Sequence, residues 1–345
     1  MRNGHVPIPL RSFFASRRRK GFRLLPPQPS TRCLNSVNPS RVSLTRRCYY
    51  RATFLHEGQG FTLCELFAMS SRYRTSVGFS LETLARRGGR DGPHKDGWGV
   101  AYFEGPDVFL LRESSPAAES GLVDYMERNG PPSKLVLSHI RLATQGEAAL
   151  RNTQPFQREL RGRAHVFAHN GNLPDVREQR CLKTSRFTPI GETDSEFAFC
   201  GLLEQLEEAW TPGNGKLPSV ELRMRIVSDF AAWLAPLGAF NFIYTDGDTL
   251  FVHSHRRKHD DGETRPPGLH LLVRSGNEQA VDLSQSGIMM APIAQELTLV
   301  ASVPLTDEPW EPIPEGEVIA LKDGVLLARQ SAAPAMQPLT HSSRS

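Results

Sequence analysis

Two amphipathic segments near the middle of the chain decide its fold class: residues 193–210, TDSEFAFCGLLEQLEEAW, and residues 220–238, VELRMRIVSDFAAWLAPLG. In the first segment, Thr193 stands three residues before Glu196, which is the spacing of a helix-capping box. Large apolar residues then recur at helical spacing on one face, and glutamates lie on the other. We predict a helix from each segment, the second ending before the turn at 236–238.

Short apolar runs on both sides of these helices predict strands. Gly, Pro and Asp separate several of the runs, as in the turns of antiparallel sheets. The predicted strands are 64–69, 98–103, 108–111, 134–140 and 164–168 before the helices, and 240–244, 250–253, 269–273, 297–303 and 318–321 after them. Strands, two helices and further strands are typical of an α+β fold with mostly antiparallel sheets.

The 345-residue chain joins two kinds of sequence near residue 63. Residues 1–63 contain eleven Arg and one Lys but a single acidic residue, whereas residues 64–345 contain 29 basic and 36 acidic residues. The net charge of +4 therefore averages a basic extension and an acidic body, and does not indicate nucleic-acid binding. We divide the chain into the extension 1–63, one domain at 64–330 and a polar, disordered tail at 331–345.

The basic extension has three interpretations. It could bind nucleic acid or an anionic membrane, or it could be a mitochondrial transit peptide, because it is rich in Arg and Ser and poor in acids. It could also be absent from the mature protein, if translation starts at Leu63 and the initiator methionine is then removed. We favour this third hypothesis, which makes Cys64 the first residue of a cytoplasmic protein and reserves a mitochondrial location for a genuine leader.

Cysteine usage and hydropathy exclude several classes of protein. The five cysteines are scattered and form no CxxC pair, so neither a disulfide framework nor a zinc site is expected. His253, His255 and His259 fit no compact ligand spacing, and we expect no metal or other cofactor. No apolar run approaches the roughly 18 residues of a membrane helix.

Cys64 is the first of four candidate functional residues or motifs. A thiol titrates near ~8.5 and needs a base to become nucleophilic at neutral pH. An α-amino group titrates at ~7.7–8.0, so a cysteine at residue one carries its own general base. An internal cysteine would have only an amide nitrogen, and a buried strand cysteine is then the simpler interpretation.

The second motif is His169-Asn170-Gly171-Asn172, which follows the predicted strand 164–168. The Asn170 amide and the Gly171 backbone N–H could stabilise a developing oxyanion. Taken by itself, Asn-Gly is more often a plain turn.

Arg141 and Asp194 complete the candidates. Arg141 ends an apolar strand, where it could bind a carboxylate with two hydrogen bonds or form a surface ion pair. Asp194 begins the first helix, where it could bind an ammonium group or only cap the helix. An arginine that binds a carboxylate, an aspartate that binds an ammonium group, a thiolate and two hydrogen-bond donors for an oxyanion together suit hydrolysis of a γ-glutamyl amide.

Residues 64–321 resemble the class II glutamine amidotransferases of the N-terminal-nucleophile (Ntn) hydrolase superfamily, particularly members without a synthase domain. Each matching motif is short, but their order and spacing are specific. The motifs are Cys64-Glu65-Leu66, Asp96-Gly97-Trp98-Gly99, the run 139–146, Asn152-Thr153-Gln154-Pro155-Phe156, His169-Asn170-Gly171, the run 192–196 and Ser302-Val303-Pro304-Leu305.

The resemblance implies a four-layer αββα sandwich and a role for each candidate residue. Cys64 would be the nucleophile, and Asn170 and Gly171 would form the oxyanion hole. Arg141 would bind the substrate carboxylate and Asp194 its ammonium group. Thr144 and Gln145 would line the pocket. The chain departs from the family pattern in its 63-residue extension, in Leu142 where relatives often have an aromatic residue, and in Gln154 where many have His.

We therefore expect an amidohydrolase that converts glutamine or a γ-glutamyl amide to glutamate through a Cys64 thioester. Three alternatives remain: a hydrolase of a larger γ-glutamyl conjugate of a glutathione-like or histidine-derived thiol, a subunit that supplies ammonia to a separate synthase, and an inactive ligand-binding module. Neither nucleic acid nor membrane is an expected partner.

Overall fold

The computed structural model describes residues 65–79, 96–141, 146–179, 182, 184–210, 216–259, 261–275, 288–290 and 295–332. All of them belong to one of the two units into which the chain divides, His56–Ser345. Cys64, Thr144 and Gln145 lie outside the described residues, as do the extension 1–63 and the tail from 333.

Two antiparallel sheets form the centre of this unit. The first has the order β15-β12-β14-β1-β5-β3-β4, and the second has the order β17-β16-β9-β8-β7-β6. Strands of the first sheet are β1 (Glu65–Thr75), β3 (Trp98–Glu104), β4 (Asp107–Glu113), β5 (Ser133–Ile140), β12 (His270–Arg274), β14 (Leu297–Ala301) and β15 (Glu311–Pro312). Strands of the second are β6 (Phe156–Leu160), β7 (Arg163–Gly171), β8 (Phe240–Thr245), β9 (Leu250–Ser254), β16 (Glu317–Lys322) and β17 (Val325–Ser331).

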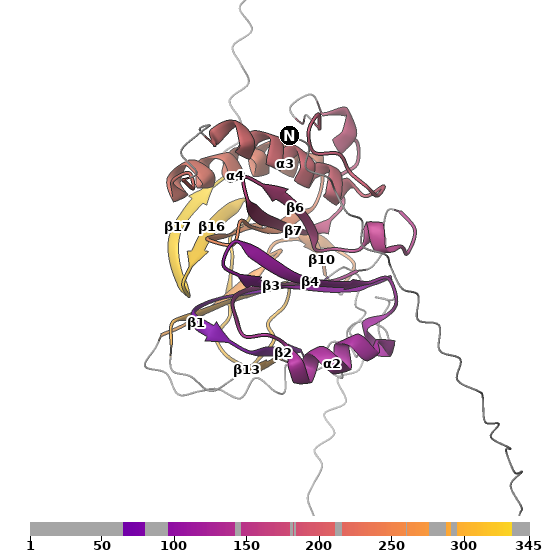
Figure 1. The fold of residues 1–345 in the computed structure, drawn as a ribbon. Coiled ribbons are helices and arrows are strands. Elements are labelled where there is room, and N and C mark those ends of the chain that lie inside the picture. The colour runs from indigo at the N-terminus through magenta and orange to yellow at the C-terminus, as the bar shows by residue number, and fades with distance from the viewer. Residues whose placement is uncertain are drawn as a thin grey trace, which may run out of the picture. The chain divides into compact units, whose positions relative to one another are not determined.

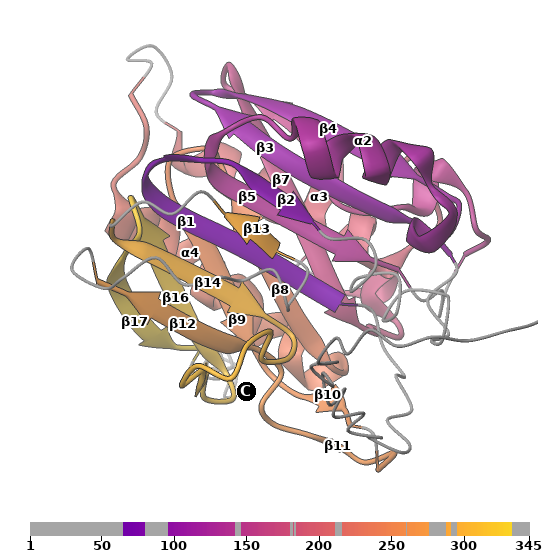
Figure 2. The ribbon, with the colours of Figure 1, turned by 90° about the horizontal axis from the view of Figure 1, so that it is seen from below.

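Helices cover the outer faces of both sheets, so the described part of the chain has four layers (Figure 1). Helices α3 (Asp194–Ala209) and α4 (Val220–Leu234) lie over the six-stranded sheet, and α2 (Gly121–Asn129) lies below the seven-stranded one (Figure 1). The view from below shows α2 and the small pair of β2 (Val77–Phe79) with β13 (Ile288–Met290) across that lower face (Figure 2). A second small pair joins β10 (Arg257–Lys258) to β11 (Thr264–Arg265). The predicted αββα sandwich is thus confirmed.

Alternation along the strands explains why both faces of each sheet are buried. In β1, Leu66 and Ala68 belong to the apolar cluster between the sheets, whereas Phe67 and Met69 belong to the cluster under α2. Successive side chains of a strand point to opposite faces, so one run of apolar residues fills two layers. Such strands appear in sequence as nearly continuous apolar runs, which is why they could be recognised as strands but not assigned to a layer.

Because the strands of both sheets are antiparallel, the strand ends lie at two opposite edges of the sandwich. In the first sheet Glu65 faces Ile140 and Ile140 faces Trp98, while in the second Gly171 faces Phe240. We call this edge of the sandwich the site pole, because every candidate residue within the described ranges lies there. The opposite edge, which contains the β3–β4, β8–β9 and β16–β17 turns, is the far pole.

Several details differ from the sequence prediction, which also lacked strand β6. Both long helices are confirmed, but α2 was missed because its nine residues are too few for a clear helical period. Thr193 caps α3 as expected, accepting a hydrogen bond from Glu196 N at 3.2 Å, but the capping box is incomplete. The Glu196 carboxylate instead accepts the Gly191 N–H at 2.7 Å and pairs with Arg158. Strand β17 continues to Ser331, one residue past the predicted end of the domain.

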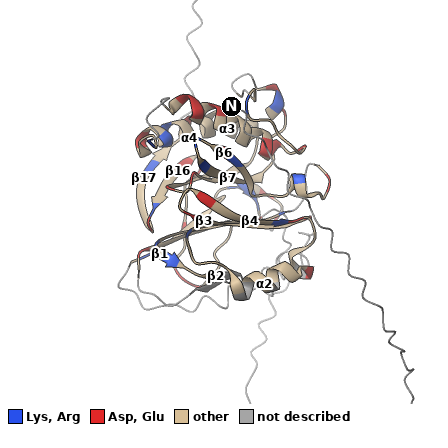
Figure 3. Ribbon diagram, in the orientation of Figure 1, with Lys and Arg blue, Asp and Glu red and all other residues tan. Residues whose placement is uncertain are grey.

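Charged residues of both signs occur throughout the part of the ribbon that is described. Basic and acidic residues are interspersed over helices and strands alike (Figure 3). Of the helices that the structure describes, none has the length and apolar character needed to cross a membrane.

Candidate functional site

Asn170 lies at the site pole with its side chain in contact with the opposite sheet. It is fully buried near the end of β7, and its Nδ2 donates to Ser302 Oγ at 3.3 Å. The same Ser302 oxygen accepts the backbone N–H of Leu66 at 3.0 Å. Leu66 is the second residue of β1, so the predicted oxyanion donor lies beside the strand that follows Cys64.

Gly171 is the last residue of β7 and could not be replaced without moving the backbone. Its φ of +150° is one that L-residues rarely adopt, and a Cβ atom there would lie 1.9 Å from Ala239 O. Asn172 N donates to the same carbonyl at 3.0 Å. The backbone of β7 therefore passes very close to the residue before β8, and only glycine fits at this position.

Arg141 directly follows β5, and its side chain is turned into the protein rather than onto the surface. The residue is 3% exposed, and its guanidinium donates to the carbonyls of Asp96 at 3.4 Å, Gly146 at 3.1 Å and Glu147 at 2.9 Å. These contacts exclude the alternative of a surface ion pair. They fix the guanidinium at the site pole, one residue beyond the partner of Glu65 in the ladder.

Asp194 does not cap α3, because Thr193 does so. The Asp194 carboxylate accepts the Leu173 N–H at 2.7 Å through Oδ2 and the Ser195 N–H at 2.8 Å through Oδ1. It is 5% exposed, and the Ser195 hydroxyl lies 3.2 Å from Oδ1. A carboxylate has about four acceptor positions, so these contacts leave capacity on Oδ2.

A buried polar network behind Asn170 went unrecognised in the sequence. His169 Nδ1 lies 2.9 Å from Ser195 Oγ, and the His169 backbone exchanges hydrogen bonds with the Gln154 side chain at 2.6 and 3.1 Å. Burial lowers the pKa of His169, and the nearby Asp194 opposes this only in part. The neutral ring joins the end of β7 to the start of α3, which keeps Asn170 and Asp194 in a fixed relation.

Gln154 and Asn152 therefore have structural roles. Asn152 is fully buried; its Nδ2 donates to Glu192 Oε2 at 2.6 Å, and its Oδ1 accepts the Glu192 N–H at 2.9 Å. A Cβ atom on Gly191 would come within 2.3 Å of that Oδ1. Both asparagine and glutamine were visible in the motif 152–156, but their partners are about 15 to 40 residues away and could not be inferred from spacing.

Cys200 is not a competing nucleophile. It is fully buried in the core under α3, and burial raises the pKa of its thiol to about 11. Cys181 lies outside the described residues. No cluster of three or more metal-ligating side chains occurs within the described parts of the chain.

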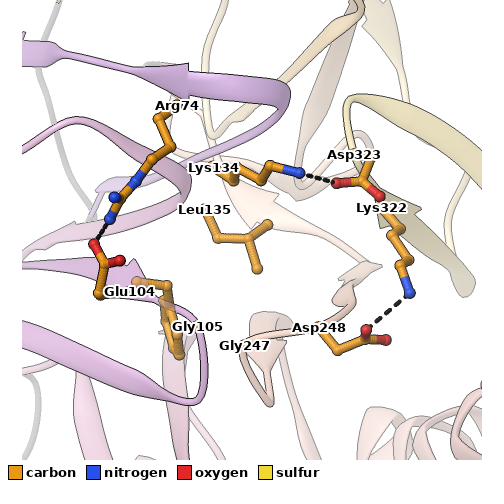
Figure 4. A pocket seen from close by; sticks show the side chains of 10 residues that line it. Arg74, Glu104, Gly105, Lys134, Leu135, Gly247, Asp248, Lys322 and Asp323 are labelled. Atoms are coloured by element: carbon orange, nitrogen blue, oxygen red, sulfur yellow. Dashed lines mark hydrogen bonds and ion pairs between the residues drawn. The ribbon is translucent and has the colours of Figure 1, made fainter.

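The far pole contains a cavity of about 420 Å³ whose charges neutralise one another (Figure 4). Lys134 reaches Asp323 at 2.9 Å, Lys322 reaches Asp248 at 2.8 Å, and Arg74 pairs with Glu104. Since the charged side chains that line the cavity are already paired with one another, we do not take it as the candidate site. None of the candidate residues lies in it.

Two buried histidines predict that the stability of the protein depends on pH. Burial lowers the pKa of His253 to about 3, with His255 adding to the effect, and burial lowers the pKa of His165 to about 4. In an unfolded chain both titrate near ~6.5, so below that pH the unfolded state binds protons that the folded state does not. The stability from these neutral rings is complete above about pH 6.5 and is lost as the pH falls toward 4 and then 3.

We expect each of these rings to lower the free energy of unfolding by about 2 kcal/mol between pH 7 and pH 5. Urea unfolding at several pH values measures this effect. His253→Gln should flatten the pH dependence by about that amount. A His253→Gln curve parallel to that of the unmodified protein would contradict the prediction.

Comparison with known proteins agrees with this fold. The sequence profile of the class II glutamine amidotransferases matches residues 63–345. The Escherichia coli protein named "Putative glutamine amidotransferase YafJ" is 35% identical over 256 residues, which cover 74% of this chain and 96% of YafJ. A Haemophilus influenzae protein named in the same way is 34% identical over 274 residues, covering 79% of this chain and 88% of the relative.

A solved structure shares the fold as well as the sequence. The crystal structure of a predicted glutamine amidotransferase from Pseudomonas aeruginosa is 30% identical and superposes with a TM-score of 0.54. The match covers 77% of this chain and all of that one. With a family profile over residues 63–345 and a relative matched along nearly its whole length, this chain belongs to the class II glutamine amidotransferase family.

Proposed function

We propose that the protein hydrolyses glutamine or a related γ-glutamyl amide, with Cys64 as an N-terminal nucleophile. The single observation that best supports this is the register of β1. Glu65 faces Ile140, next to Arg141, and Leu66 shares the Ser302 hydroxyl with Asn170. Consecutive Cα atoms are ~3.8 Å apart, so Cys64 is tied covalently to this meeting point of the two sheets.

In the proposed reaction the free α-amine of Cys64 takes the thiol proton, and the thiolate adds to the amide carbonyl. The Asn170 side chain and the Gly171 N–H stabilise the resulting oxyanion. The protonated amine then gives its proton to the leaving nitrogen as the C–N bond breaks, which leaves a γ-glutamyl thioester. Water hydrolyses the thioester to glutamate and frees the thiol.

Charge complementarity supports the orientation of the substrate. Arg141 would bind the α-carboxylate, and the Oδ2 atom of Asp194 would accept the α-ammonium group. Both residues are at least 95% buried, so their charges act in a setting of low dielectric. Thr144 and Gln145 follow Arg141 in sequence and would line the same pocket.

Intact-mass analysis with an electrophilic glutamine analogue tests the proposal. One adduct should form, and peptide mapping should place it on Cys64 of a chain whose Cys64 amine is free. Free glutamine should protect against labelling. Labelling of Cys200 alone, or an active enzyme with an acylated Cys64 amine, would rule the mechanism out.

Asn170→Ala removes one predicted oxyanion donor and should lower kcat for glutamine by about 10²–10³-fold. Steady-state glutamate release measures the effect, and thermal unfolding checks that the variant is folded. The exposed neighbour provides a control, since Asn172→Ala should change kcat little. Unchanged turnover by folded Asn170→Ala would refute the assigned role.

A further inference from the structure

Two buried side chains hold the predicted oxyanion donors from opposite sides. Ser302 follows β14, is 1% exposed and contacts the Asn170 side chain. Asn241 lies in β8, is fully buried and contacts the Asn170 backbone. Neither has a chemical role in the reaction described above.

Ser302 brings the oxyanion donor and the nucleophile strand to one atom. Its Oγ accepts from Leu66 N at 3.0 Å and from Asn170 Nδ2 at 3.3 Å. A hydroxyl oxygen has two acceptor positions, so these two donors can fill both of them. The Ser302 backbone is anchored as well, because its N–H donates to Leu66 O at 3.1 Å and its carbonyl accepts from Arg257 at 3.1 Å.

Asn241 acts on the peptide group between Asn170 and Gly171. Its Nδ2 donates to Asn170 O at 3.2 Å and to Arg256 O at 2.9 Å, while its Oδ1 accepts the His255 N–H at 2.7 Å. Asn170 C=O and Gly171 N–H belong to one planar trans peptide and point in opposite directions. The contact with Asn241 therefore directs the Gly171 N–H away from β8.

Close packing leaves Asn241 little freedom. A Cβ atom on Gly268 would lie 1.7 Å from Asn241 Oδ1, so the chain passes directly against the amide. Both ends of the amide are engaged, which also defines its orientation.

We propose that Ser302 and Asn241 are positioning residues that aim the two oxyanion donors at the carbonyl attacked by Cys64; this rests on the function proposed above. Ser302 sets the Asn170 amide relative to β1, and Asn241 sets the Gly171 N–H. Oxyanion donors must lie within about 2.7–3.1 Å of the developing charge, and an error near ~1 Å can cost about 10²-fold in rate. Loss of either contact should therefore reduce kcat more than substrate binding.

Ser302→Ala tests the first contact against a matched control. Ser70 in β1 is likewise a buried serine of the seven-stranded sheet that contacts the other sheet. At the far pole, its Oγ accepts a hydrogen bond from Gly324 N at 3.1 Å. We expect Ser302→Ala to lower kcat for glutamine by about 10-fold or more, with KM nearly unchanged. Ser70→Ala should leave kcat unchanged while lowering the melting temperature comparably.

A double-mutant cycle separates positioning from general structural damage. In an Asn170→Ala background, Ser302→Ala should lower kcat much less than it does in the unmodified enzyme, because the amide that it positions is already absent. Asn241→Asp keeps the shape and the acceptor for His255 N but loses the donor to Asn170 O. It should lower kcat in the Asn170→Ala background too, since the Gly171 N–H still acts there.

The outcomes distinguish this inference from the proposed function. If Asn170→Ala is slow while folded Ser302→Ala and Asn241→Asp both keep full kcat, the positioning role is wrong and the proposed function stands. The role is equally wrong if the Ser302→Ala effect persists in full without Asn170. If Asn170→Ala itself keeps full activity, both fall together. Each kcat is measured on enzyme whose intact mass shows a free Cys64 amine, and each variant is checked by thermal unfolding.

Discussion

An enzyme whose first residue is Cys64 is expected to hydrolyse glutamine about 10²–10⁴-fold faster than one in which a residue remains attached to Cys64. The reason is the nitrogen of Cys64 itself. A free α-amine titrates at ~7.7–8.0 and can take the thiol proton near neutral pH, whereas an amide nitrogen cannot. Activity of the free form should accordingly rise with pH until that amine is deprotonated.

The comparison needs two preparations that differ at one peptide bond. One begins at Cys64, and the other carries a single additional glycine that resists removal. Intact mass confirms each start, and kcat for glutamine and the rate of labelling by an electrophilic analogue are measured on both. Equal rates would show that the α-amine is not the base. If both preparations hydrolyse glutamine slowly and the Asn170→Ala variant is no slower than they are, the whole mechanism is contradicted.

Replacing Arg223 is expected to cost about 3–5 kcal/mol of stability without touching the site pole. Arg223 in α4 is 1% exposed and pairs with the fully buried Asp246, and its Nη2 lies 3.0 Å from Asp248 Oδ2. Burial raises the pKa of Asp248, but hydrogen bonds from Lys322 and Arg223 outweigh it and lower that pKa to about 2. Without Arg223, the buried Asp246 carboxylate would lose the cation that pairs with it.

Urea unfolding of Arg223→Met measures this cost. Arg329→Met is the matched control, because Arg329 donates to Glu317 at 3.0 Å but keeps 36% of its side chain exposed. Exposed pairs contribute about 0–1 kcal/mol. The double variant Arg223→Met/Asp246→Asn should recover much of the loss, since Asn keeps the acceptor for the Asp248 and Thr249 N–H groups. A loss in Arg223→Met no larger than in Arg329→Met would contradict the expectation.

Local patterns were enough to predict the α+β class and most of its elements, whereas the four-layer arrangement was implied by the family resemblance. The ten predicted apolar runs correspond to β1, β3, β4, β5, β7, β8, β9, β12, β14 and β16, and the two amphipathic segments became α3 and α4. Both kinds of element are set by the burial of side chains at a repeat of 2.0 or 3.6 residues, which short segments display directly. Helix α2 escaped because nine residues do not establish a period, and the layer of each strand escaped because both of its faces are apolar.

The roles of the candidate-site residues could likewise be predicted only in part from the sequence. Gly171 could be marked from its motif, and the structure adds the reason, since the Ala239 carbonyl leaves no room for a side chain. For Arg141, the choice between a surface ion pair and a buried guanidinium depended on carbonyls of residues 96, 146 and 147. For Asp194, the capping role could be rejected only from the structure, in which Thr193 caps the helix and Leu173 N donates to Oδ2.

Residue type and spacing already identified the chemical groups of this protein: a cysteine with a potential free amine, an Asn-Gly pair, an arginine and an aspartate. Which of them meet, and what holds them, depended on contacts between segments remote in the chain, such as Ser302 with Leu66 across 236 positions and with Asn170 across 132. Hydrogen bonds of this kind leave no period or motif in the chain, because they arise only when two sheets pack and bring their strand ends to one pole.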